Sequence, residues 1–140
     1  MIWNKDDYVL TDDFEKMDVD KVCDMLMETY WAKRNTKDIM KKSFSKSICF
    51  SLFYNDEQIG FARVVSDEAV FSWICDVVVE EPYRGKGLGS WMMDCITNFD
   101  KISSTRQLLA TRDAHGFYEK FGFNKAHSML KVPQSNKQDS

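Results

Sequence analysis

The chain has 140 residues, a length at which one domain can bury a core of its own. Hydrophobic residues make up 44% of it and aromatic residues 14%, which excludes a largely disordered chain. The formal net charge of −3 excludes the strongly basic surface typical of nucleic-acid-binding proteins, so we expect no nucleic-acid partner.

The first half of the chain predicts a strand, two helices and a β-hairpin. Residues 8–10 form a short apolar strand. Residues 18–33 repeat apolar side chains at spacings of three and four, the pattern of an amphipathic helix with Asp18 as its N-cap. A second helix begins near Thr36 and carries a lysine-rich side, which we interpret as a solvated face. Residues 48–54 and 59–65 are the two strands of the hairpin.

The second half predicts strands that alternate with helices. A long strand over 70–79 is followed by a helix that ends near Phe99, and then by a strand over 106–112. A short helix closed by Gly122 and a last strand over 123–132 complete the chain. We expect one domain over 1–132 and a flexible polar tail over 133–140. This order indicates an α/β (α+β) fold in which 70–79 and 106–112 are parallel.

The four cysteines, Cys23, Cys49, Cys75 and Cys95, lie singly in apolar runs, and no two have the C-x-x-C spacing. With only two histidines in the chain, this pattern predicts no metal site and buried free thiols, as expected in the reducing cytoplasm. No apolar run reaches the roughly 18 residues that span a bilayer, and the N-terminus lacks the pattern of a signal peptide. We therefore expect a cytoplasmic protein with no membrane association.

Half of the chain's six glycines lie in one corner, the sequence EEPYRGKGLGSW over 80–91. The corner falls between a predicted strand and a predicted helix, where unpaired backbone N–H groups and the helix dipole both favour an anion. Arg84 and Lys86 add positive charge, so the corner predicts a phosphate-bearing ligand. The dinucleotide fingerprint fails here because it needs a glycine at Ser90, and the nucleoside-triphosphate loop fails because its spacing is absent.

Residues 84–89, RGKGLG, instead resemble the R-x-x-G-x-G signature of the GNAT acetyltransferase superfamily. Residues 117–123, FYEKFGF, are similar to the late Tyr-x-x-x-Gly-Phe element of that family. The likeness covers about 48–123 and is strongest to a bacterial branch whose substrates are mostly unassigned. It implies a mixed, mostly antiparallel central sheet of six to seven strands, with helices on both faces and a splay between the two central parallel strands.

The resemblance further implies acetyl-CoA as cosubstrate, with no metal. Its pyrophosphate would lie on the glycine corner, and its pantetheine arm would pair with the strand before it, at an edge opened by a bulge near Asp76 or Val77. The implied cofactor-binding residues are Val77, Val78, Val79, Arg84, Gly85, Lys86, Gly87, Leu88, Gly89, Ser90 and Tyr118.

For the chemistry, the resemblance implies Tyr118 as the general acid that protonates the leaving thiolate. A backbone N–H group of 77–79 would stabilise the oxyanion. The sequence leaves the general base open. Asp76 stands within an apolar run where burial would raise its pKa, His115 has a suitable intrinsic pKa, and a chain of water molecules could replace both.

Candidate acceptor-binding residues are Tyr30, Trp31, Arg63, Phe71 and Trp73. Alternating aromatic residues are more often core than pocket, and Arg63 could bind an acceptor carboxylate or pair with a structural acid. The expected function is acetyl transfer from acetyl-CoA directly to the primary amine of a small molecule. The alternatives are a peptide or protein N-acetyltransferase and a non-catalytic acetyl-CoA-binding regulatory module. A homodimer is compatible with the composition, and the sequence leaves the acceptor and the oligomeric state open.

Overall fold

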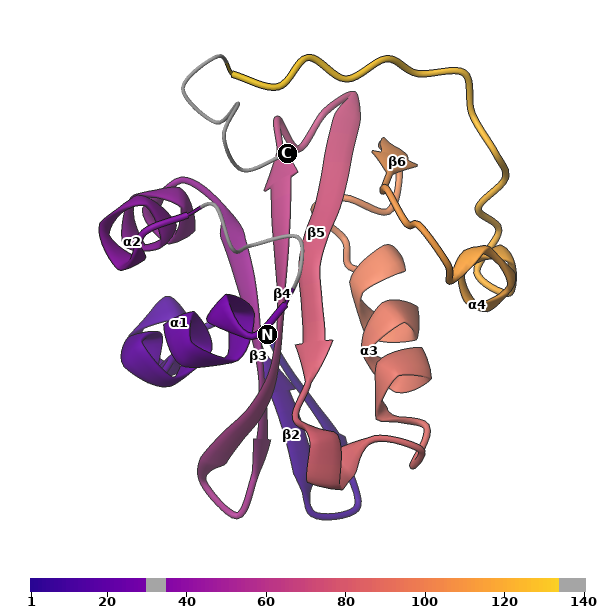
Figure 1. The fold of residues 1–140 in the computed structure, drawn as a ribbon. Coiled ribbons are helices and arrows are strands. Elements are labelled where there is room, and N and C mark those ends of the chain that lie inside the picture. The colour runs from indigo at the N-terminus through magenta and orange to yellow at the C-terminus, as the bar shows by residue number, and fades with distance from the viewer. Residues whose placement is uncertain (30–34, 134–140) are drawn as a thin grey trace.

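The structure, a computed structural model, describes residues 1–29 and 35–133. Their six strands form one sheet in the order β1-β2-β3-β4-β5-β6 (Figure 1). All neighbouring pairs are antiparallel except β5 and β6, which are parallel, so the predicted mixed, mostly antiparallel sheet is confirmed. The strands are β1 (Ile2–Lys5), β2 (Tyr8–Thr11), β3 (Ile48–Tyr54), β4 (Glu57–Ser66), β5 (Phe71–Val79) and β6 (Arg106–Leu108).

Helices cover both faces of this sheet. Helices α1 (Val19–Met27) and α2 (Lys37–Ser45) lie on one face, and α3 (Leu88–Thr97) lies on the other, with α4 (His115–Glu119) beyond it (Figure 1). The chain also makes two short 3-10 turns, η1 (Phe14–Lys16) and η2 (Glu81–Tyr83). Asp18 caps α1 as predicted, because its carboxylate accepts from the Lys21 N–H at 3.2 Å.

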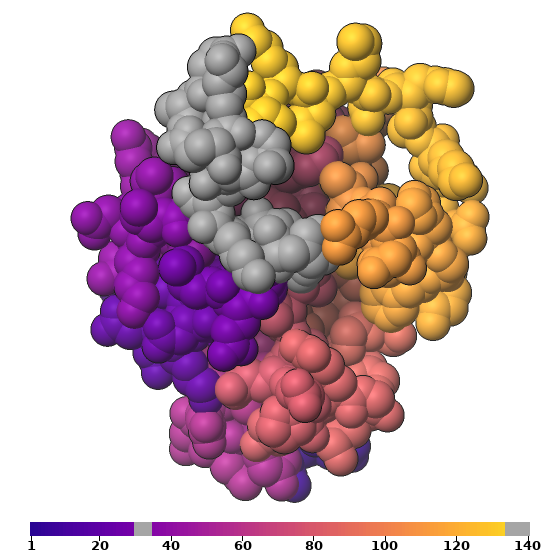
Figure 2. All heavy atoms as spheres, in the orientation of Figure 1, coloured from indigo at the N-terminus to yellow at the C-terminus, as the bar shows by residue number. Residues whose placement is uncertain are grey.

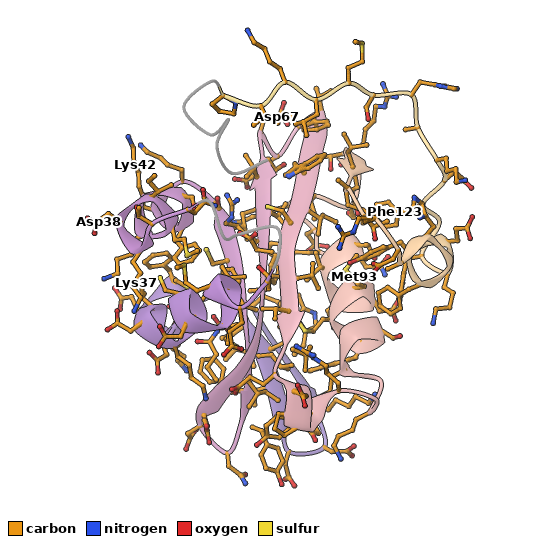
Figure 3. All side chains as sticks on the ribbon, viewed as in Figure 1. Lys37, Asp38, Lys42, Asp67, Met93 and Phe123 are labelled. Carbon is orange, nitrogen blue, oxygen red and sulfur yellow. The ribbon has the colours of Figure 1, made fainter. Side chains whose placement is uncertain are left out.

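Two apolar layers hold the helices on the sheet. On the α3 face the buried side chains include Phe50, Ile74 and Met93, the last labelled in Figure 3. On the α1 and α2 face they include Phe44 and Phe61, whose rings meet edge to face at 5.3 Å. Burying one such side chain contributes about 1.5–3 kcal/mol. Successive side chains of a strand point to opposite faces, so each central strand packs into both apolar layers.

The lysine-rich side of α2 is exposed, as Lys37, Asp38 and Lys42 show in Figure 3. Lys37 pairs with Asp24 of α1 at 3.0 Å, and both side chains remain mostly exposed. Such exposed ion pairs contribute at most about 1 kcal/mol to the free energy of unfolding. We therefore interpret this side of α2 as a solvated polar surface. Within the described residues, no helix has both the length and the apolar character needed to cross a membrane.

Four elements differ from the prediction, the first of which is α1, whose last residue is Met27 although the helical pattern was predicted to continue to residue 33. β1 was not expected, and β6 ends at Leu108 rather than at residue 112. The strand predicted over 123–132 is wrong, because residues 123–133 form no strand, and in Figure 2 this segment arches away from α4. Its apolar residues Met129 and Leu130 are adjacent and fully or largely exposed. Because these side chains stay in solvent, they contribute no burial free energy to hold the segment against the sheet.

Candidate active site

The sheet is splayed between β5 and β6, and β6 is the edge strand within the described residues rather than a central one as expected. Their parallel pairing runs only from Phe71, opposite Arg106, to Trp73, opposite Leu108. Residues 74–79 of β5 pair with no strand on this side within the described part of the chain. The splay expected between these two strands is therefore present.

A bulge lies on the other side of β5, where it pairs with β4. Phe61 stands opposite Val78 and Arg63 opposite Cys75, so two residues of β5 face the single residue Ala62. Asp76, one of these two residues of β5, has a φ of 54°. This matches the bulge predicted near Asp76 or Val77, and a bulge bends its strand away from the regular ladder.

The backbone of β5 beyond the bulge is directed into the splay. The Glu80 N–H donates to the Ile59 carbonyl at 2.8 Å, so Glu80 faces β4 and Val79, by alternation, faces away from it. Val77 and Val79 pack against the α3-side core and Val78 against the opposite core, so these residues alternate regularly. Val77 and Val79 thus present main-chain groups where an extended amide-bearing arm can add to the strand.

The glycine corner closes the end of this edge. Gly85 and Gly87 have φ values of 78° and 79°, and Gly87 is the N-cap of α3 without any side-chain cap. The first helical hydrogen bond runs from the Trp91 N–H to the Gly87 carbonyl, which leaves the N–H groups of 88–90 without intrahelical partners. Such donors, together with the helix dipole, favour the binding of an anion.

Arg84 and Lys86 supply the positive charge predicted for this corner, and both are exposed. The Arg84 Nε donates to the Val79 carbonyl at 2.8 Å. This bond ties the corner to the last residue of β5, so the anion site and the free strand edge are held as one unit.

Tyr118 lies on α4, on the same side of the sheet as α3. Its ring packs against Phe117 at 5.0 Å and Phe123 at 6.2 Å between centroids, and it is half-buried. A Cβ on Gly89 would lie 3.6 Å from the Phe117 ring, so α4 sits against the first turn of α3. The fold therefore brings Tyr118 to the element that carries the glycine corner. His115 is exposed and lies three residues before Tyr118 on the same helix face.

Asp76 and Arg63, two other candidates, bind each other. The Arg63 Nε donates to Asp76 Oδ2 at 2.8 Å, and Nη1 donates to Ser47 Oγ at 3.1 Å. Of the two readings of Arg63, the structure thus shows pairing with an acid. Cys49 and Cys75 stand opposite Arg63 on either side, and burial raises the pKa of both thiols to about 12.

The remaining acceptor candidates are dispersed. Phe71 is exposed at the start of β5 and Trp73 is half-buried two residues later, whereas Tyr30 and Trp31 lie outside the described residues. A pocket of about 200 Å³ lies elsewhere, between the end of α1 and η2. It is lined by Met25, Glu28, Thr29, Val78, Glu80, Glu81, Pro82 and Arg84. Sequence patterns did not predict this pocket, because its walls come from segments about fifty residues apart.

Comparison with known proteins agrees with this geometry. The family model described as "Acetyltransferase (GNAT) domain" matches residues 45–125. The uncharacterized N-acetyltransferase ycf52 of Gracilaria tenuistipitata var. liui is 32% identical over 113 residues, which cover 76% of this chain and 60% of that relative. The chain therefore spans less than two thirds of the length of this relative.

Solved structures give the same fold. A Xanthomonas campestris pv. campestris protein, described as belonging to the GNAT family, has a TM-score of 0.84 and 31% identity over 90% of this chain and 94% of its own. A GNAT family acetyltransferase from Elizabethkingia anophelis, solved with acetyl-CoA bound, has a TM-score of 0.69. It shares 16% identity over 88% of this chain and 80% of its own, a likeness that concerns the fold alone.

Proposed function

The chain belongs to the GNAT acetyltransferase family, and on this premise we propose that it transfers an acetyl group from acetyl-CoA directly to the primary amine of a small molecule. The observation that carries the proposal is the continuity of the splay with the glycine corner. The free edge of β5 is followed by η2 and the glycine corner, which ends in the N–H groups at the start of α3, and the bond from Arg84 to the Val79 carbonyl ties the corner to that edge. A ligand with an extended amide-bearing arm and a pyrophosphate can bind both parts, the arm at the strand edge and the pyrophosphate at the helix N-terminus.

We place the pyrophosphate on the backbone of 85–90 and the pantetheine arm along Val79 and Val77. The arm then adds to the strand edge by main-chain hydrogen bonds. The acetyl-CoA in the Elizabethkingia anophelis protein of the same fold supports this cosubstrate. The four free cysteines support a cytoplasmic location, since thiols remain reduced there.

In the reaction, the amine nitrogen attacks the thioester carbon, and a backbone N–H at the splay stabilises the oxyanion. The C–S bond then breaks, and the CoA thiolate takes a proton from the Tyr118 hydroxyl. The amine loses its own proton to water or to His115, which is exposed. We assign no base role to Asp76, because its carboxylate is engaged by Arg63.

Direct transfer predicts that Cys75 carries no acetyl group during turnover. With a pKa of about 12, its thiol is ionised in roughly one molecule in 10⁵ at pH 7, and only the thiolate is a useful nucleophile. Cys75→Ala should keep kcat within about twofold of wild type. Mass spectrometry of the enzyme with acetyl-CoA alone should detect no added acetyl group. An acetylated Cys75 that is consumed on addition of amine would contradict direct transfer.

The pocket beside Val78 supports a small cationic acceptor. Its volume of about 200 Å³ suits a small molecule better than a folded chain. Among the described residues, its lining carries the carboxylates of Glu28 and Glu81 against the one cation Arg84, and Glu80 is already paired with Lys21 at 3.2 Å, so the balance of charge favours an ammonium group. Val78 of β5 lines the pocket, and its neighbours Val77 and Val79 belong to the edge on which we place the pantetheine arm.

A screen of acceptors tests the proposed function. Release of CoA is measured by a thiol reagent with panels of small amines, polyamines, amino acids and peptides. We expect turnover with small cationic amines. Turnover only with peptides would favour the peptide N-acetyltransferase, and acetyl-CoA binding without release on any acceptor would favour the regulatory module. A chain that does not bind acetyl-CoA would overturn the proposal.

A further inference from the structure

We propose that Arg63 and Asp76 are positioning residues whose ion pair holds the bulge of β5 in place and so aims the backbone of Val77 into the splay. This inference rests on the proposed function, because it concerns the edge that would receive the pantetheine arm. It assigns Asp76 to the geometry of the strand and not to proton transfer.

The backbone conformation of Asp76 is unfavourable by itself, so interactions from other segments must hold it in place. Its φ of 54° lies in the left-handed region, which costs a residue with a side chain roughly 1–2 kcal/mol, although aspartate and asparagine tolerate it better than most. Two residues of β5 share the space opposite Ala62 at this point. A regular strand would have neither the positive φ nor the extra residue. It would also turn the main-chain groups of Val77 in another direction.

The ion pair supplies that constraint. Arg63 lies on β4, directly beside the bulge, and holds the Asp76 carboxylate at 2.8 Å. Its second bond, to Ser47 Oγ at 3.1 Å, fixes the guanidinium from the segment between α2 and β3. Asp76 is thus held from outside its own strand, by residues that are themselves anchored.

Burial makes the loss of one partner of the ion pair costly in free energy. The side chains of Arg63 and Asp76 are 19% and 14% exposed. The flanking thiols of Cys49 and Cys75 have pKa values raised by burial to about 12, so they remain neutral and cannot replace the carboxylate. Truncation of either side chain to Ala leaves the other largely buried without its hydrogen-bonding partner.

The two roles of Asp76 predict opposite effects for conservative variants. Asn accepts the Arg63 hydrogen bond and tolerates positive φ, and Gly adopts positive φ without strain. Neither can act as a base. We expect Asp76→Asn to stay within about fivefold of wild type in kcat and in KM for acetyl-CoA. We expect Asp76→Ala and Arg63→Ala to lose about 10–100-fold in kcat/KM, a size typical of misplaced reacting groups. Asp76→Gly should recover part of the loss of Asp76→Ala.

Four measurements test the pair: kcat and KM, the pH–rate profile, the Kd for acetyl-CoA by calorimetry, and the melting temperature. The positioning role predicts an unchanged shape of the pH profile and a double Ala variant no worse than the poorer single variant. Loss of activity in Asp76→Asn as severe as in Asp76→Ala, with loss of the acidic limb of the profile, would overturn it in favour of a base. Equal Kd values for wild type, Arg63→Ala and Asp76→Ala would also overturn it.

Calorimetry keeps this test independent of the proposed function. If no acceptor turns over, the proposed function fails, and the order of Kd values among Asp76→Asn, Asp76→Gly and Asp76→Ala still decides on the pair. If Arg63→Ala does not fold, the same three Asp76 variants leave Arg63 intact and give the decision alone.

Discussion

Replacing Tyr118 by Phe is expected to lower kcat at least about tenfold, because it removes the proton donor to the leaving thiolate. The ring itself remains, so its packing against Phe117 and Phe123 should persist. The variant should therefore stay folded, which its melting temperature checks, and its Kd for acetyl-CoA should change little. Steady-state kinetics with the best acceptor from the screen measures the effect.

Tyr8→Phe is a matched control for this variant. Tyr8 lies on β2, where its ring contacts Tyr54 at 5.0 Å, and its strand is separated from β5 by two others. Loss of a hydroxyl there should leave kcat within experimental error. An unchanged kcat in Tyr118→Phe as well would remove Tyr118 from the chemistry.

Replacing Gly87 by Val is expected to raise the Kd for acetyl-CoA by at least about 30-fold, equivalent to about 2 kcal/mol of binding free energy. Gly87 has a φ of 79°, which a β-branched residue adopts only with strain. A Cβ there would meet no protein atom within 4 Å, so the side chain would instead occupy the approach to the N–H groups of α3. Calorimetry of acetyl-CoA binding checks this result.

Gly122→Val provides the control, because it introduces the same kind of strain outside the glycine corner. Gly122 has a φ of 92° and likewise has no protein atom within 4 Å of an added Cβ. Both variants should lose about 1–2 kcal/mol of unfolding free energy, and only Gly87→Val should lose cosubstrate affinity. Equal Kd values in the two variants would make the corner an ordinary turn.

Local patterns in the sequence predicted most of the fold. The three-and-four spacing before Met27 and the apolar run before Glu80 identified α1 and β5, because each depends on neighbours in the chain. The glycine corner was found for the same reason. The absent strand over 123–132 marks the limit of such patterns, since β-propensity does not ensure one continuous buried face.

The parts of the site that depend on pairing between strands could not be predicted from the sequence. Asp76 stood out as a charge in an apolar run, but its partner follows from a register shift that no local pattern encodes. The bond from Arg63 to Ser47 spans 16 residues, and the pocket joins α1 to η2. Such contacts form only after the chain has folded, so sequence spacing alone could not reveal them.

The edge of β5, which is unpaired over 74–79 within the described residues, is expected to promote self-association when no ligand covers it. An exposed row of main-chain donors and acceptors is a template for a strand from another molecule, and the segment here includes the apolar run of Val77, Val78 and Val79. A ligand that occupies this edge also shifts the folding equilibrium, by about 2.7 kcal/mol at 100 times its Kd. Acetyl-CoA would then stabilise the folded protein and cover its unpaired strand edge, besides donating the acetyl group. Protein purified with acetyl-CoA should therefore aggregate more slowly on storage than protein purified without it.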